Sequence, residues 1–145
     1  MRQSSKYLSG FLLLAITLLI GCNDPPWEVD TAIDVMTKNN LTTFSFSGNG
    51  YPILFSVWAY RNDSSDFLWQ LVPDDSQNLK QAYKLAPIIY GQVPLGWKQI
   101  NPKNGEPPFL QEGKKYSVSS ISNGANTKLT IFTIHQGLVK ILNES

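Results

Sequence analysis

The chain has 145 residues, of which 42% are hydrophobic and 16% charged, and its formal net charge is +1. So neutral a chain excludes a broad basic surface for nucleic acid or anionic lipid. Its one cysteine, Cys22, excludes an internal disulfide, and its one histidine, His135, excludes a metal site built from several histidines.

The N-terminal segment has the pattern of an export signal. Arg2 and Lys6 precede an apolar stretch at residues 11–20, which is too short to anchor the chain across a bilayer. The tetrapeptide L-I-G-C at residues 19–22 resembles the lipobox of bacterial lipoproteins. This resemblance implies that the leader is cleaved before Cys22 and that lipid is attached to its thiol.

This pattern predicts three segments: a signal peptide at residues 1–21, a lipidated tether at residues 22–26 and a single domain at residues 27–145. The alternative is that Cys22 is an ordinary buried cysteine behind a signal peptide. Without a disulfide, the domain must be stabilised by its core alone, which its length allows.

Lipidation implies a location in the periplasm, on one of two membranes. In the lipoprotein family, aspartate directly after the lipidated cysteine is associated with retention in the inner membrane. Asn23 followed by Asp24 resembles a weaker form of that signal. We expect the inner face of the outer membrane, with the inner membrane as the alternative.

Apolar and polar residues alternate along most of the predicted domain, as is typical of half-buried strands. Short segments rich in β-forming residues are separated by turns rich in glycine, asparagine and proline. They lie at residues 27–35, 42–46, 53–61, 67–72, 87–90, 115–121, 128–134 and 138–142. We therefore predict an all-β protein, an antiparallel sandwich of about seven strands in two sheets.

Two segments depart from simple alternation. Residues 53–61 are apolar on both faces, which predicts a central strand covered on two sides. Residues 91–112 contain four prolines, which interrupt β-ladders, together with several large apolar side chains. We expect this second segment to be one long loop that packs across the domain.

The segment from Leu110 to Val118 reads L-Q-E-G-K-K-Y-S-V. It resembles the L-x-x-G-x-x-Y-x-V stretch of immunoglobulin-like and fibronectin type III domains. The resemblance implies an immunoglobulin-like fold in which Leu110 and Gly113 lead into a strand and Tyr116 forms a tyrosine corner. It also implies that Trp58 is the core tryptophan. The alternative is that this segment is an ordinary connection between a loop and a strand.

The residues that carry chemistry form no catalytic pattern. His135 is predicted at the end of a strand, without a nucleophile or an orienting acid in a recognisable motif. Asp63, Asp66, Asp74 and Asp75 lie at predicted turns, where aspartate is favoured by local hydrogen bonds. We therefore expect no enzyme activity, no metal site and no cofactor.

Residues 47–51 contain the pattern S-G-x-x-Y, which resembles the loop that periplasmic lysozyme inhibitors insert into the lysozyme cleft. This resemblance implies that Ser47 and Tyr51 would contact the catalytic carboxylates of a lysozyme. The alternative is a plain hairpin turn.

In its size, signal and β character, the chain resembles periplasmic immunity lipoproteins of type VI secretion systems. This resemblance implies that it binds a protein toxin delivered by a neighbouring cell. Tyr90, Leu95, Trp97 and Lys98 are the predicted partner-binding residues, because interface energies concentrate in large aromatic side chains. The alternatives are that Leu95 and Trp97 cover an open edge of the sandwich, or that the chain is an assembly factor of the envelope that pairs through the strand at residues 27–35.

Overall fold

The computed structural model describes residues 30–60, 66–75, 79–123 and 129–142. The predicted signal peptide, Cys22, Asn23, Asp24 and the rest of the tether lie outside the described residues, as does the beginning of the predicted first strand. Asp63 lies in another segment that is not described. No helix in the described part of the chain is long and apolar enough to cross a membrane.

The described residues form nine strands and one short 3-10 helix, η2 (Ala82–Lys84). The strands are β1 (Thr31–Lys38), β2 (Leu41–Gly48), β3 (Pro52–Ala59), β4 (Asp66–Pro73), β5 (Ile88–Ile89), β6 (Trp97–Asn101), β7 (Lys115–Ser122), β8 (Leu129–His135) and β9 (Leu138–Leu142). The prediction of an all-β protein with two antiparallel sheets is confirmed.

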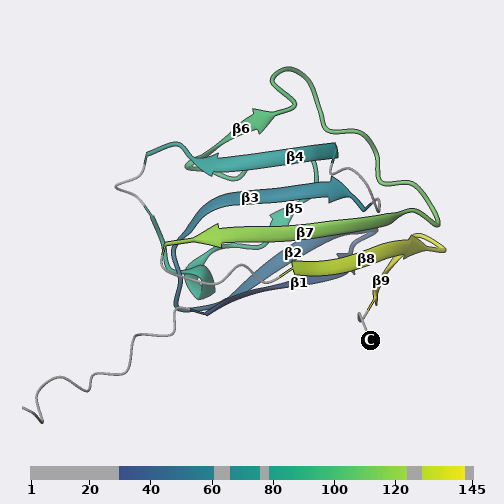
Figure 1. The fold of residues 1–145 in the computed structure, drawn as a ribbon, viewed down its shortest axis with the longest axis horizontal. Helices are drawn as coiled ribbons and strands as arrows, with labels where there is room; N and C mark the ends of the chain where they lie inside the picture. The colour runs from purple at the N-terminus through teal and green to yellow at the C-terminus, as the bar shows by residue number, and fades with distance from the viewer. Residues whose placement is uncertain (1–29, 61–65, 76–78, 124–128, 143–145) are drawn as a thin grey trace, which may run out of the picture.

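Three strands make one sheet, in the order β1-β2-β5, and six make the other, in the order β6-β4-β3-β7-β8-β9 (Figure 1). All pairings between the strands are antiparallel. The registers place the start of β1, the start of β3, the end of β4 and the start of β6 at one end of the sandwich. We call this the Asp30 end, because the described chain begins there.

A cluster of aromatic rings fills the space between the sheets. Phe44, Phe55, Trp69 and Phe132 are fully buried. Phe55 contacts Phe44 and Trp69 edge to face, with ring centroids 5.1 and 5.7 Å apart, an arrangement that aromatic quadrupoles favour. This cluster joins both sheets into one core.

The core tryptophan is Trp69 in β4, so the prediction of Trp58 is wrong. Trp58 lies on the opposite face of β3 from Phe55 and Val57 and is only partly buried. Alternation along β3 was read correctly, but no second layer in the described part of the chain covers the Trp58 side. The expectation of a central strand is confirmed, since β3 lies between β4 and β7, whereas Leu54 and Trp58 on its second face are only partly buried.

The proline-rich segment contains a strand that the sequence analysis missed. β6 pairs with β4, with Trp97 opposite Pro73 and Asn101 opposite Gln70. The four prolines of this segment lie outside β6, so its backbone donors stay available for the ladder. β5 confirms the short strand expected at residues 87–90.

The glycine-rich turn at residues 48–50 carries the chain from one sheet to the other instead of closing a hairpin. Gly48 ends β2 in the three-stranded sheet, and Pro52 begins β3 in the six-stranded sheet. The plain hairpin expected there is therefore wrong.

Candidate functional site

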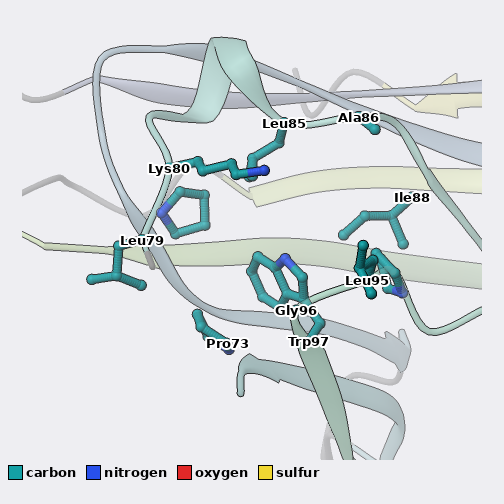
Figure 2. Close-up of a pocket in the computed structure, with 11 residues that line it drawn as sticks. Pro73, Leu79, Lys80, Leu85, Ala86, Ile88, Leu95, Gly96 and Trp97 are labelled. Atoms are coloured by element: carbon teal, nitrogen blue, oxygen red, sulfur yellow. The ribbon is translucent and has the colours of Figure 1, made fainter. Parts of the chain in front are cut away.

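A pocket of about 390 Å³ opens at the Asp30 end, beside Trp97 (Figure 2). The start of β6 forms one wall, since the backbone N–H of Asp74 donates to the carbonyl of Gly96 at 2.9 Å. The segment that carries η2 forms another wall, with Lys80 and Leu85. Trp97 is partly buried against the core, whereas the side chain of Leu95 is fully exposed at the rim.

The predicted partner-binding residues do not form one surface. Leu95 and Trp97 line the pocket. Lys98 follows on the opposite face of β6, where its ammonium lies 3.9 Å from the carboxylate of Asp74. Tyr90 has a structural position, because its hydroxyl donates to the carbonyl of Pro108 at 2.8 Å and its ring meets Trp69 edge to face.

Burial raises the pKa of the Tyr90 phenol well above its ordinary value, and the neighbouring phenol of Tyr116 adds to that shift. Desolvation penalises the charged phenolate, so Tyr90 stays protonated. This group therefore holds the segment at residues 107–110 against the core and supplies no base.

Ser47 and Tyr51 are exposed, but the loop between them is held against the domain. The backbone N–H of Asp30 donates to the side-chain oxygen of Asn49, and the N–H of Asn49 donates back to the carbonyl of Asp30, both at 3.0 Å. Gly50 is buried, and its carbonyl accepts from Ala82 at 2.6 Å. The loop therefore does not project as one that enters an enzyme cleft.

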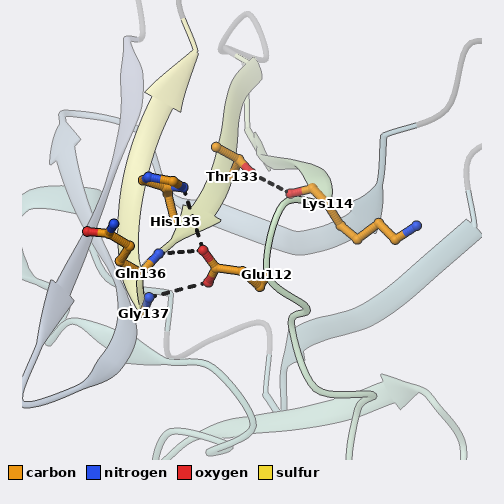
Figure 3. A network of polar contacts seen from close by, with 6 residues as sticks. All are labelled: Glu112, Lys114, Thr133, His135, Gln136 and Gly137. Carbon is orange, nitrogen blue, oxygen red and sulfur yellow. Dashed lines mark hydrogen bonds and ion pairs between the residues drawn. The ribbon is translucent and has the colours of Figure 1, made fainter.

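His135 ends β8, as predicted, and lies beside Glu112 (Figure 3). Its Nδ1 is 3.6 Å from a carboxylate oxygen of Glu112. The same carboxylate accepts from the backbone N–H groups of Gln136 and Gly137, which form the turn between β8 and β9. Glu112 therefore holds this turn, and in the described residues no three His, Cys, Asp or Glu side chains are grouped to bind a metal ion.

One apolar surface was missed by the sequence analysis. It is the face of the six-stranded sheet that points away from the three-stranded sheet, and we call it the outer face. Residues directly opposite each other in neighbouring strands share a face. The registers place on it the apolar residues Leu54, Trp58, Phe67, Val72, Ile121, Leu129, Ile131 and Leu142.

Two aromatic rings lie near the middle of the outer face. Trp58 and Phe67 pair across β3 and β4, with ring centroids 5.8 Å apart. Phe67 and Leu129 are 47% and 48% exposed, whereas Ile131 is 6% exposed. Part of the outer face, around Ile131, is therefore shielded from water by neighbouring side chains, whereas Phe67 and Leu129 remain accessible.

Small hydroxyl residues and lysines complete the outer face. Ser117, opposite Ile131, is fully buried, and its hydroxyl has no hydrogen-bond partner among the residues that the structure describes. Lys115 and Lys140 lie on one row of the outer face, on either side of Thr133. The outer face therefore combines an apolar centre with a basic margin.

Comparison with known proteins found no matching family model, no matching curated protein and no matching solved structure.

Proposed function

We propose that this chain is a lipid-anchored periplasmic protein that acts by binding another protein, and that the partner is a toxin delivered by a competing cell. The membrane anchor is the lipid on Cys22, with the domain on the inner face of the outer membrane. The chain is not a catalyst, and it neutralises the partner by occupying its surface.

The observation that supports a binding role is the outer face centred on Trp58 and Phe67. Monomeric proteins rarely leave a contiguous apolar surface of this kind without function. An antiparallel sheet with one solvated face normally carries polar residues there. Partly buried tryptophan and its aromatic neighbour are the side chains in which binding energy concentrates.

The margin of the outer face indicates the charge of the partner. Lys115 and Lys140 project from the row that also holds Thr133, at the end opposite Asp30. An acidic margin around an apolar patch on the partner would complement them and speed association. We therefore favour a partner with an acidic rim over a second copy of this chain, which would set lysine against lysine.

Two further points support this choice. The loop at residues 47–51 is held to Asp30 and Ala82, which disfavours the alternative of a lysozyme inhibitor. We also propose an immunoglobulin-like topology, since β1, β2 and β5 form one sheet while β4, β3, β7 and β8 are consecutive in the other.

The test is a protection experiment in a bacterium. The full chain is co-expressed with the product of its adjacent gene, which is directed to the periplasm. We expect that product to stop growth and the full chain to restore it. A neighbour that is not toxic, or toxicity that the chain does not relieve, contradicts the role as an immunity protein.

A pair of variants tests the outer face. Phe67→Asp combined with Leu129→Asp places two charges in the apolar centre, at positions about half exposed in the native fold. The matched control, Phe109→Asp with Val93→Asp, makes the same change on exposed positions elsewhere. We expect the first pair to weaken binding of the purified toxin at least about tenfold and to abolish protection, while the control retains both. Binding that is unchanged in the first pair, with an unchanged melting temperature, contradicts the proposed surface.

A further inference from the structure

The sandwich is closed along one side and open along the other. On the closed side, the hydroxyl of Thr130 in β8 donates to the carbonyl of Ile33 in β1 at 3.0 Å. The N–H of Val139 in β9 also donates to the hydroxyl of Thr37 in β1 at 2.8 Å. On the open side, the two-residue strand β5 and the edge strand β6 leave the core to be covered by connecting segments.

The pocket beside Trp97 lies on this open side and reaches core residues. Ile88, only 2% exposed, and the fully buried Pro52 both line it. Protein interiors are packed to a density that leaves few holes larger than a water molecule. The volume of about 390 Å³ falls instead in the usual range of ligand pockets.

The described residues that line the pocket are mostly apolar, and one of them carries a charge. The lining is made mainly by aliphatic, proline and indole groups, among them Leu79, Leu85, Ile88, Pro94, Leu95 and Trp97. Among the lining residues that the structure describes, Lys80 is the one with an ionisable side chain. Figure 2 shows its side chain lying across the pocket, with the ammonium beside Leu85.

We propose that this pocket binds a single-chain anionic amphiphile of the fatty-acid type. The hydrocarbon chain lies against Ile88, Leu85 and Trp97, and the acid group pairs with the ammonium of Lys80. Lys80 is exposed, so its ammonium can pair from the solvent side with an acid group at the pocket, a partner that a neutral hydrocarbon lacks.

The place of the pocket agrees with a supply of such molecules from a membrane. Asp30 is bonded to the turn at residues 48–50, and the carbonyl of Gly50 accepts from Ala82, two residues after Lys80. The pocket mouth thus lies at the end where the tether joins the domain. Asp30 lies eight positions after Cys22, and a chain of that length spans at most about 29 Å when extended. The supply of the ligand from a membrane rests on the proposed lipid anchor, whereas the chemistry of the pocket lining does not depend on it.

The test is native mass spectrometry of the full chain, purified from membranes in a maltoside detergent and titrated with three probes. Palmitate carries a carboxylate, lysophosphatidylglycerol carries a phosphate, and hexadecanol is neutral. We expect saturable palmitate binding and roughly threefold weaker binding of hexadecanol, because only the anion pairs with the exposed ammonium of Lys80. If palmitate binds and lysophosphatidylglycerol does not, the ligand is a free fatty acid. If both anions bind, the site also accepts the phosphate headgroup of a membrane lipid.

Three variants locate the site. Lys80→Met should reduce palmitate binding to the level of hexadecanol, whereas Lys103→Met, on an exposed loop between β6 and β7, should leave it unchanged. Ala86→Trp, which fills the pocket from an exposed position, should remove binding of all probes. Equal binding of palmitate and hexadecanol, equal effects of the two lysine variants, or no saturable adduct overturns the proposal. The double variant Phe67→Asp and Leu129→Asp should leave palmitate binding unchanged. A failure of the proposed toxin-binding surface can therefore be distinguished from a failure of the pocket proposal.

Discussion

The hydroxyl of Tyr116 accepts a hydrogen bond from the backbone N–H of Gln111, five residues earlier, at 2.7 Å. The ring of Tyr116 is 4% exposed and lies 5.6 Å from that of Phe132. This is the backbone contact that the L-x-x-G-x-x-Y-x-V motif predicts. It ties the segment before β7 to the core, next to Glu112, which holds the turn between β8 and β9.

Tyr116→Phe should lower the free energy of unfolding by about 1 kcal/mol, since it removes one net hydrogen bond while keeping the ring. The measurement is urea denaturation followed by circular dichroism. Tyr51→Phe is the matched control, because Tyr51 is 38% exposed, and it should change stability by less than about 0.5 kcal/mol. Equal effects of the two variants would show that the hydrogen bond contributes nothing.

Gly113 precedes this contact with a φ of +73°, and a Cβ added there would meet no atom within 4 Å. A side chain at position 113 would therefore destabilise the fold only through its unfavourable backbone conformation, and not through a clash. Gly113→Ala should destabilise the fold by about 1–2 kcal/mol. Gly113→Asn should cost less, because asparagine tolerates the left-handed region. The midpoints of thermal unfolding should rank wild type, Asn and Ala in descending order, and a reversed order of Asn and Ala contradicts this reading.

Local patterns predicted every described strand except β6, and also the Tyr116 contact, because these depend on residues near in sequence. The identity of the core tryptophan depends on which face of the sheet is covered. Residues 53–61 are apolar on both faces, so their sequence alone does not show which face points into the core. Register between β3 and β4, which shifts between Val57 and Trp58, decides that Trp69 points inward. The pocket and the outer face are likewise built from segments that lie far apart in the chain. The sequence of any single segment therefore does not reveal either surface.

The positions of the two tryptophans give different expected costs. The indole N–H of Trp69 donates to the side-chain oxygen of the partly buried Gln99 at 2.8 Å. Trp69→Phe should cost about 1–3 kcal/mol, through lost packing and an unpaired amide. Trp58→Phe should cost less than about 1 kcal/mol, because Trp58 is only partly buried. The comparison uses urea denaturation of both variants, and a larger loss for Trp58→Phe contradicts the assignment of the core.

Gly50 is required where the sheets are joined. A Cβ on Gly50 would lie 2.2 Å from the hydroxyl oxygen of Thr31 and 3.0 Å from the Cβ of Ser122. Gly50→Ala should therefore cost about 1–3 kcal/mol through overpacking. In a Thr31→Ala background the same change should cost about 1 kcal/mol less, since the nearest atom is gone. Purely additive effects in this double-mutant cycle would mean that the two residues do not clash.

Stability at high pH should depend on Tyr90. Its pKa is raised by burial in the folded state, whereas the unfolded chain titrates near the ordinary value of about 10. Between these two values the unfolded state releases the proton and the folded state retains it, so unfolding becomes more favourable as pH rises. The contribution of Tyr90 is thus fully present below pH of about 10 and is lost above it.

Tyr90→Phe isolates this contribution, because phenylalanine keeps the ring beside Trp69 and cannot ionise. At neutral pH the variant should be less stable, since the carbonyl of Pro108 loses its donor. As pH rises above about 10, the difference between wild type and variant should shrink. The measurement is the free energy of unfolding of both proteins by urea at several pH values from 7 to 11. A difference that is constant with pH would mean that the Tyr90 phenol ionises as readily in the folded protein as in the unfolded chain, and one that grows with pH would mean that it ionises more readily in the folded protein.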